Sequence, residues 1–248
     1  MKTNISIIIP CYNSGAYLER TVEEIRAALA DEPDLKAQIV LVNDGSSDDT
    51  FEAVRRLCAL DGRIVGVDLA ENAGQANARM AGLSFARGSI ALFMDDDGQH
   101  PARGIGPLVR KCQEGYHLVY ARFPVLKETG FRRFAGSVHN CMLTVLAGKP
   151  LGLRITSFFA VDSAGLALIR GEKRPRPFIG ATFFRRTRKI TSVPMDHRER
   201  AEGRSNYNLR KLVRFWYSMM VAPYLPRREE GPAWKVREVL NPPPELTR

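Results

Sequence analysis

The segment SIALFMDDDGQHP, residues 89–101, runs from apolar side chains directly into three consecutive carboxylates. Its first six residues form a short apolar run that indicates a buried β-strand, and this strand is predicted to end at Asp95. In α/β sheets, ligands bind beyond the carboxyl ends of the strands. The three aspartates are therefore the first candidates for a functional site.

Three neighbouring carboxylates repel one another unless a cation neutralises part of their charge. Asp95 and Asp97 alternate along an extended chain, so both side chains can reach one divalent ion from the same side. Gln99 offers a further oxygen atom, and oxygen ligands suit Mg²⁺ or Mn²⁺. Such an ion is typically shared with a diphosphate. The alternative interpretation is an Asp-rich turn that caps a helix starting near Pro101.

The residues before this segment alternate between short apolar runs and stretches whose apolar residues recur at helical spacing. Strands are predicted over residues 5–10, 39–42 and 63–69, and helices over residues 16–30, 48–60 and 73–86. This alternation predicts an α/β fold with a Rossmann-like, mostly parallel sheet flanked by helices. Tyr12 and Asp44 follow the first two strands, so we expect them at the same edge of the sheet as the aspartates.

The pattern after Pro101 is less regular. Helices are predicted over residues 104–115 and 131–147, a strand over 118–122, and short apolar pieces over 166–169 and 189–193. Residues 208–222 have apolar side chains at helical spacing with Arg and Lys on the other faces, which predicts a basic amphipathic helix. We therefore expect one α/β domain over residues 1–207, this helix, and a polar, proline-rich tail over 223–248 that is loosely held.

The composition of the 248 residues, 44% hydrophobic and 26% charged, excludes a disordered chain and a disulfide-stapled miniprotein. The cysteines lack a C-x-x-C spacing, which argues against a zinc knuckle and predicts reduced thiols in a cytosolic setting. They are Cys11, Cys58, Cys112 and Cys141. No stretch reaches the roughly 18 apolar residues that span a bilayer, and the N-terminal apolar run is too short for a signal peptide. We therefore expect no integral membrane segment.

The net charge of +10 is unevenly distributed along the chain. Residues 1–100 have a net charge of −7, residues 101–169 of +6, and residues 170–248 of +11. A basic half suggests a polyanionic partner. We find no helix-turn-helix, RNP or zinc-finger pattern, so we expect no nucleic acid partner. An anionic membrane surface or a phosphorylated substrate fits the same charge.

Three blocks in the first hundred residues resemble family 2 glycosyltransferases of the GT-A fold: IIIPCYNSGAYL, IVLVNDGSSDDT and NAGQANARMAGLSFARGSIALFMDDDGQHP. Their order and spacing match that family. The second half is similar to the polyprenyl-phosphate branch, which includes dolichyl-phosphate mannose synthases, bactoprenol glucosyltransferases and undecaprenyl-phosphate aminoarabinose transferases. The matching places are residues 119–122, the pair Arg133 and Ser137, and residues 200–207.

The resemblance implies a role for each matching residue. The base and ribose of a nucleotide sugar, such as a UDP- or GDP-sugar, would be held by Pro10, Tyr12 and Asp44. The metal and the diphosphate would be held by Asp95, Asp97 and Gln99. Arg200 would clamp the donor diphosphate, with Arg204 nearby, so that the catalytic set is Asp95, Asp97 and Arg200. The acceptor phosphate would be held by Arg122, Arg133 and Ser137.

Three positions depart from the family pattern. Ser14 stands where Glu usually follows Tyr-Asn. Asn206 stands where several members have a phosphate-binding Lys, for which Arg204 is a substitute. Residues 156–159, Thr-Ser-Phe-Phe, stand where the branch reads Ser-Phe-Arg, so the arginine is missing. These departures affect donor identity and the handling of the acceptor.

The resemblance implies an inverting, metal-dependent transfer of a sugar from a nucleotide donor to a polyprenyl phosphate. A saccharide hydroxyl acceptor needs a general base, and residues 148–181 contain no acidic pair of the kind that such enzymes use. A phosphate monoester is already anionic and needs no base. Two alternatives remain open: the same fold acting on a saccharide hydroxyl, and a non-catalytic platform that binds membrane or nucleic acid.

The basic helix over residues 208–222 predicts a peripheral enzyme at the inner face of the cytoplasmic membrane. Branch members commonly continue into transmembrane helices at this point, whereas this chain continues into a polar tail. The sequence is therefore compatible with a peripheral enzyme, with one that needs a membrane-protein partner, and with a shortened chain. It does not specify the sugar or the base of the donor.

Overall fold

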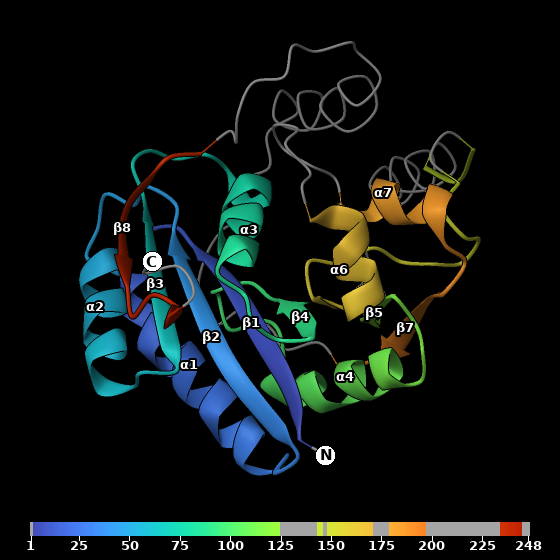
Figure 1. The fold of residues 1–248 in the computed structure, drawn as a ribbon, viewed down its shortest axis with the longest axis horizontal. Helices are drawn as coiled ribbons and strands as arrows, with labels where there is room; N and C mark the ends of the chain where they lie inside the picture. Colours follow the sequence, from blue (N-terminus) through green and yellow to red (C-terminus); the bar gives the residue numbers. More distant parts are fainter. Residues whose placement is uncertain (1, 125–142, 146–147, 171–178, 197–233, 245–248) are drawn as a thin grey trace.

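A computed structural model describes residues 2–124, 143–145, 148–170, 179–196 and 234–244 (Figure 1). Its centre is an eight-stranded sheet in the order β7-β5-β6-β4-β1-β2-β3-β8. The strands are β1 (Thr3–Cys11), β2 (Leu35–Asn43), β3 (Ile64–Leu69), β4 (Ile90–Phe93), β5 (Leu118–Arg122), β6 (Phe159–Val161), β7 (Ile190–Pro194) and β8 (Val236–Leu240). The helices are α1 (Gly15–Ala30), α2 (Thr50–Leu60), α3 (Gln75–Ser84), α4 (Ile105–Gln113), α6 (Ser163–Ile169) and α7 (Ile179–Arg186).

The sheet is mixed and mostly parallel, as predicted. The pairs β1–β2, β1–β4, β2–β3 and β5–β7 are parallel, whereas β3–β8, β4–β6 and β5–β6 are antiparallel. All five strands predicted in residues 1–122 are present, with ends that differ by a few residues. Their β-branched and apolar residues are buried on both faces, which is the reason that they read as continuous apolar runs.

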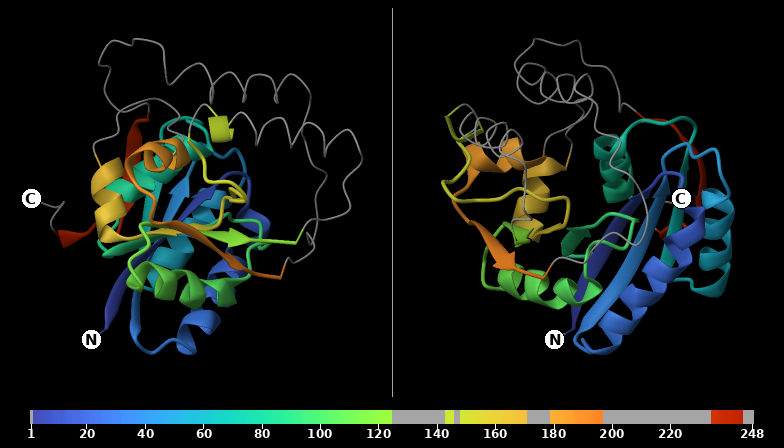
Figure 2. Two further views of the ribbon diagram at one scale, coloured as in Figure 1. Left: turned by 90° about the vertical axis from the view of Figure 1, so that its right-hand side faces the viewer. Right: turned by 180° about the vertical axis from the view of Figure 1, so that it is seen from behind.

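Helices cover both faces of the sheet, which gives a three-layer arrangement (Figures 1 and 2). Ile7 and Ile9 of β1 belong to one core cluster, together with buried residues of α1, α2 and α4. Ile8, whose side chain points the other way, belongs to a second cluster with residues of α3, α6 and α7. Because successive side chains of a strand alternate between the two faces, one strand contributes to both cores.

The parallel register brings the carboxyl ends of three strands to one edge of the sheet. Cys11 at the end of β1 pairs with Asn43 at the end of β2, and Ile8 of β1 pairs with Phe93 at the end of β4. The polar residues that follow these strands therefore start from neighbouring positions. This edge is where the sequence predicts the functional site.

The expectation of a loosely held C-terminal tail is wrong for residues 236–240. These residues form β8, which pairs antiparallel with β3 and completes one edge of the sheet (Figure 1). The sequence VREVL has only a weak strand pattern, and the pairing to β3 is a long-range contact that no local signal reports. The short strand β6 and the helix α7 were also not predicted.

Other predictions lie outside the described residues. They are the amphipathic helix over 208–222 and most of the helix over 131–147. Within the described residues, none of the helices is both long and apolar enough to cross a bilayer. Cys11, Cys58 and Cys112 are buried free thiols, in agreement with the expectation of reduced cysteines.

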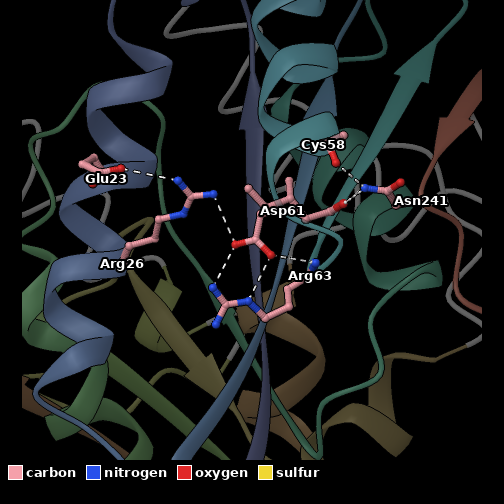
Figure 3. Close-up of polar contacts among 7 residues, drawn as sticks. Glu23, Arg26, Cys58, Asp61, Arg63 and Asn241 are labelled. Atoms are coloured by element: carbon pink, nitrogen blue, oxygen red, sulfur yellow. Dashed lines mark hydrogen bonds and ion pairs between the residues drawn. The ribbon is translucent and has the colours of Figure 1, made fainter.

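An ionic cluster ties the end of α2 to α1 on the side of the sheet covered by these helices (Figure 3). Asp61 accepts hydrogen bonds from the side chain of Arg63 at 2.9 and 3.0 Å and from Arg26 at 3.2 Å. Its own side chain is only 12% exposed. The hydrogen bonds from Arg63, with the Arg63 charge and Arg26, lower the pKa of Asp61 to about 2.

Replacing Asp61 with asparagine is expected to lower the free energy of unfolding at pH 7 by about 1–2 kcal/mol. The folded-state pKa lies below the ordinary value of 3.8, so the stabilisation is fully present above that pH and is lost as the pH falls towards 2. Urea unfolding from pH 7 to pH 3 measures this difference. Glu23→Gln is the control, because this exposed partner of Arg26 contributes little. Equal losses in both variants would contradict the assignment.

Candidate active site

The loop after β1 is tied to the loop after β4. The backbone N–H of Tyr12 donates to Oδ2 of Asp96 at 3.1 Å, and the hydroxyl of Thr21 on α1 donates to the Asp96 carbonyl at 3.0 Å. Tyr12 itself is 52% exposed. A large aromatic side chain left exposed beside a cluster of carboxylates is available to a ligand.

Asp44 shapes the loop that precedes α3. It is almost fully buried, and its two carboxylate oxygens accept the backbone N–H groups of Ala73 at 2.7 Å and Gly74 at 3.0 Å. Burial raises the pKa of Asp44, although these two hydrogen bonds act in the opposite direction. The side chain of Asn72 donates back to the Asp44 carbonyl. The loops after β2 and β3 therefore form one hydrogen-bonded unit.

Asp95 is held by donors from two other parts of the fold. Its Oδ1 accepts the amide of Gln75 at 2.7 Å and the guanidinium of Arg79 at 2.9 Å, both from α3. Its Oδ2 accepts the hydroxyl of Ser157 at 2.5 Å. The side chain of Arg79 is only 13% exposed and lies over the ring of Phe159 at 5.8 Å. The largely covered guanidinium of Arg79 therefore compensates the Asp95 charge, although the arginine of the family pattern is missing.

His100 joins this cluster through both ring nitrogens. Its Nδ1 accepts the backbone N–H of Asp95 at 2.9 Å, so the neutral ring must have its proton on Nε2, which lies 3.3 Å from the Ser157 hydroxyl. The ring stacks between Phe158 at 5.0 Å and Phe123 at 5.9 Å. His100 thus connects the aspartate cluster to the end of β5.

The remaining carboxylates differ in environment. Burial raises the pKa of Asp96 to about 6, and the charge of Asp95 adds to this effect. Oδ1 of Asp97 accepts the backbone N–H of Gln99 at 3.1 Å. Asp97 and Gln99 are partly exposed, and their oxygen atoms are of the kind that Mg²⁺ and Mn²⁺ prefer.

Among the described residues, no three His, Cys, Asp or Glu side chains are placed to hold a metal ion. Asp95 already accepts three hydrogen bonds from side chains. The donor set thus fits an ion that has Asp97 and Gln99 as ligands and takes its other ligands from a bound diphosphate. Metal ligation by Asp95, Asp97 and Gln99 stays a prediction.

Arg122, at the end of β5, lines a cavity of about 630 Å³. Arg154 lines the same cavity, and both arginines are exposed. Neither guanidinium has an acidic or hydrogen-bonding partner within the described part of the chain. The other lining residues are Phe123, Pro124, Gly152, Pro194, Met195 and Asp196. The carboxylate of Asp196 also lines the cavity but pairs with Arg103 at 3.0 Å, so the net positive charge of the lining favours an anionic ligand.

Asp162 lies at the opposite end of the strands from the aspartate cluster. It follows β6, which runs antiparallel to β4 and β5, and its carboxylate caps α6 through the N–H of Gly165 at 2.7 Å and contacts His117 at 3.0 Å. This carboxylate has a structural role and is far from the strand ends that form the site. Glu172, the other acidic residue of residues 148–181, lies outside the described residues.

The structure thus brings five of the predicted site residues to the carboxyl ends of the strands: Tyr12, Asp44, Asp95, Asp97 and Gln99. Pro10 is buried within β1. Arg122 lies at the neighbouring cavity. Arg133, Ser137, Arg200 and Arg204 lie outside the described residues. Sequence reasoning missed the partners of Asp95 and the second arginine of the cavity. They are Gln75, Arg79, Ser157 and Arg154.

A family model described as glycosyl transferase family 2 matches residues 6–168. The chain belongs to glycosyltransferase family 2. The match includes the aspartate cluster, both loops that contain Tyr12 and Asp44, and the strand that ends at Arg122.

Curated relatives within this family match most of the chain. An undecaprenyl-phosphate 4-deoxy-4-formamido-L-arabinose transferase from Edwardsiella ictaluri (strain 93-146) is 32% identical over 220 residues, 87% of this chain and 66% of the relative. A protein of the same name from Erwinia tasmaniensis is 34% identical over 224 residues, with the same coverage. The matched part of the chain thus spans just under two thirds of the length of these relatives.

Solved structures support the fold of this family 2 chain. A mannosyltransferase from Pyrobaculum calidifontis in complex with GDP-Man and Mn²⁺ has a TM-score of 0.63 at 18% identity and covers 94% of this chain and 66% of its own. A mannosyl-3-phosphoglycerate synthase from Rubrobacter xylanophilus has a TM-score of 0.60 at 19% identity and covers 99% and 91%. The predicted family and its GT-A fold are both confirmed.

Proposed function

We propose that this family 2 chain is an inverting, metal-dependent glycosyltransferase that moves a sugar from a nucleotide sugar to a polyprenyl phosphate. The observation that supports this best is the cavity with Arg122 and Arg154, next to the carboxylate cluster. Phe123 of that cavity stacks on His100, and His100 accepts a hydrogen bond from Asp95. A donor site and an anion site are thus in contact through one aromatic stack.

The donor is a nucleoside diphosphate sugar in this proposal. Its base and ribose lie against Tyr12, Asp44 and the end of β1 at Pro10, where the exposed ring of Tyr12 offers a stacking surface. Its diphosphate lies beside Asp97 and Gln99. The solved mannosyltransferase from Pyrobaculum calidifontis contains GDP-Man and Mn²⁺, and a solved glucosyl-3-phosphoglycerate synthase from Mycobacterium tuberculosis contains UDP-Glc and Mn²⁺. These complexes support Mn²⁺ as the metal and a nucleoside diphosphate sugar as the donor in the proposal.

The acceptor phosphate lies in the cavity between Arg122 and Arg154. Each guanidinium donates charge-assisted hydrogen bonds to phosphate oxygens, and two such groups orient the phosphate. Arg133 and Ser137 complete this site in the proposal. Relatives with 32% and 34% identity are named as transferases acting on undecaprenyl phosphate, which supports a lipid phosphate as the acceptor.

The chemistry is a single displacement. A phosphate oxygen of the acceptor forms a bond to the anomeric carbon while the bond from that carbon to the donor diphosphate breaks, and the configuration inverts. The leaving diphosphate takes the electron pair. Asp97 and Gln99 would hold a divalent ion, which would supply positive charge at this diphosphate. Arg200 has the same task in the proposal, and the acceptor needs no general base because it is anionic.

A polyprenyl phosphate is a membrane lipid, so the proposed reaction takes place at a lipid surface. The positive charge of residues 101–248 and the basic pattern of residues 208–222 support binding to an anionic membrane. We infer a peripheral position at the inner face of the cytoplasmic membrane, where a membrane-protein partner would help to anchor the enzyme. Lipid vesicles are therefore part of any assay.

An acceptor panel tests this proposal. Purified protein receives UDP- and GDP-sugars, Mn²⁺ and one of three acceptors: undecaprenyl phosphate in anionic vesicles, a water-soluble alkyl phosphate, or a free saccharide. We expect release of nucleoside diphosphate and a glycosylated lipid with undecaprenyl phosphate, and weaker transfer to the alkyl phosphate. Faster transfer to the saccharide would contradict the proposal and favour glycan assembly. Membrane binding without any donor turnover would favour a non-catalytic platform.

A further inference from the structure

The C-terminal strand β8 contacts the loop that leads from β3 to α3. Val239 pairs with Val67 and Glu238 with Asp68, and the register shifts between Asp68 and Leu69. Just before the strand, the carbonyl of Lys235 accepts the backbone N–H of Ala70 at 2.9 Å. Figure 2 shows β8 at the edge of the molecule, beside α2. The strand thus lies against the chain four residues before the Gly74 that binds Asp44.

One exposed side chain of β8, that of Arg237, pairs with a buried carboxylate of β3. The guanidinium of Arg237 donates to Oδ2 of Asp68 at 3.1 Å and to the carbonyl of Ala70 at 2.8 Å. The side chain of Asp68 is 1% exposed, so its charge needs a compensating partner, whereas the side chain of Arg237 is 61% exposed. The other oxygen of Asp68 accepts the side-chain amide of Asn43 at 2.7 Å. Arg237 therefore connects β8 to the end of β2.

Asn43 also contacts the loop after β2. Its Oδ1 accepts the backbone N–H of Ser46 at 3.3 Å, while its amide is fixed by Asp68. Gly45, between Asn43 and Ser46, has a φ of +64°. Any side chain at this position would bring its Cβ to 2.5 Å from the backbone nitrogen of Asn72. The loops after β2 and β3 are therefore in close backbone contact.

We infer that β8 is a brace for the donor-binding loops and that Arg237 is a positioning residue for nucleotide binding. The inference rests on the proposed function, because these loops present Asp44 to the donor. Arg237 fixes the loop after β3 through Ala70 and the loop after β2 through Asp68 and Asn43. The C-terminal residues thereby contribute to a site formed by the first hundred residues.

The next residue of the strand offers a matched control. The carboxylate of Glu238 accepts two hydrogen bonds from Arg55 of α2, at 2.5 and 3.1 Å, and makes no hydrogen bond or ion pair with either loop among the described residues. The end of β8 is held separately, because the side chain of Asn241 donates to the carbonyls of Cys58 and Ile64 (Figure 3). Variants of Arg237 and of Glu238 each remove one ion pair of the same strand while Asn241 keeps the strand end attached.

The experiment compares Arg237→Met, Arg237→Lys and Glu238→Gln with the wild type. Amide hydrogen exchange is followed at Ser46, Ala73 and Gly74, with the amides of β1 as the measure of global stability. Titration with nucleoside diphosphate and Mn²⁺ gives the Kd. We expect about tenfold faster exchange at the loop amides and an about fivefold or larger rise in Kd for Arg237→Met. Arg237→Lys should recover part of both, and Glu238→Gln should change neither.

Unchanged loop exchange in Arg237→Met would overturn the brace. Equal effects in Arg237→Met and Glu238→Gln would also overturn it, because the strand would then act only through stability. Faster loop exchange with an unchanged Kd would overturn the link to nucleotide binding. If loop exchange is faster in Arg237→Met but the wild type itself binds no nucleotide, the proposed donor site is overturned. The positioning role of Arg237 is then overturned with it.

Discussion

Replacing Asp97 with alanine is expected to abolish the Mn²⁺-dependent part of nucleotide binding and to lower kcat/KM by about 100-fold or more. Asp97 is a partly exposed carboxylate just after the end of β4, and its Oδ1 accepts the backbone N–H of Gln99. In the proposed function, the substitution thus removes a carboxylate that holds the ion at the leaving diphosphate. Calorimetric titration with and without Mn²⁺, followed by turnover assays, measures both effects.

A matched control separates this local effect from the change in net charge. Glu114→Ala removes the same charge from an exposed carboxylate that follows α4 and pairs with Lys111. This variant is expected to bind nucleotide and turn over as the wild type does. Nucleotide binding by Asp97→Ala that still tightens with Mn²⁺ would contradict the role of Asp97.

Replacing both Arg122 and Arg154 with glutamine is expected to raise the KM for the phosphate acceptor about 100-fold while the Kd for the donor nucleotide stays unchanged. Both guanidiniums line one cavity and have no partner within the described residues, so their removal leaves no buried charge unpaired. Each single variant should raise the KM for the acceptor by a smaller factor than the double variant. Steady-state kinetics with varied acceptor, together with donor titration, measures the two constants.

Arg110→Gln is the control for this pair. Arg110 is an exposed arginine on α4 that pairs with Glu32 at 2.8 Å, away from the cavity. Its replacement should leave both constants unchanged. A double variant of Arg122 and Arg154 that loses donor binding and acceptor binding equally would show that these arginines serve the donor or the fold instead.

The strands that form the centre of the fold were predictable because each is an apolar run with a clear stop. Residues 5–10 end at a proline, and residues 89–94 end at Asp95. Such strands are buried on both faces, so their composition alone identifies them. The strand β8 differs because it lies at the sheet edge, where Val236 is 40% exposed and charged residues are tolerated. Its sequence resembles that of a polar tail, and only the pairing with β3 distinguishes the two.

The candidate site was predictable at the strand ends and not beyond them. Asp95 and Asp97 stand out because clustered carboxylates follow a buried strand. The contact of Asp95 with Arg79 and Ser157 depends on how α3 and the residues before β6 pack against β4, which no local pattern encodes. The burial of Asp44 was hidden for the same reason, because its partners Ala73 and Gly74 come from another loop.

The most direct test of the account is a calorimetric titration of the wild-type protein with a panel of nucleoside diphosphates, with and without Mn²⁺. The account predicts that one nucleotide binds, that Mn²⁺ tightens its binding, and that the Asp97→Ala variant loses this tightening. Absence of binding for every nucleotide, in a protein that is folded and titrated with Mn²⁺ present, would contradict the donor site at the ends of β1, β2 and β4.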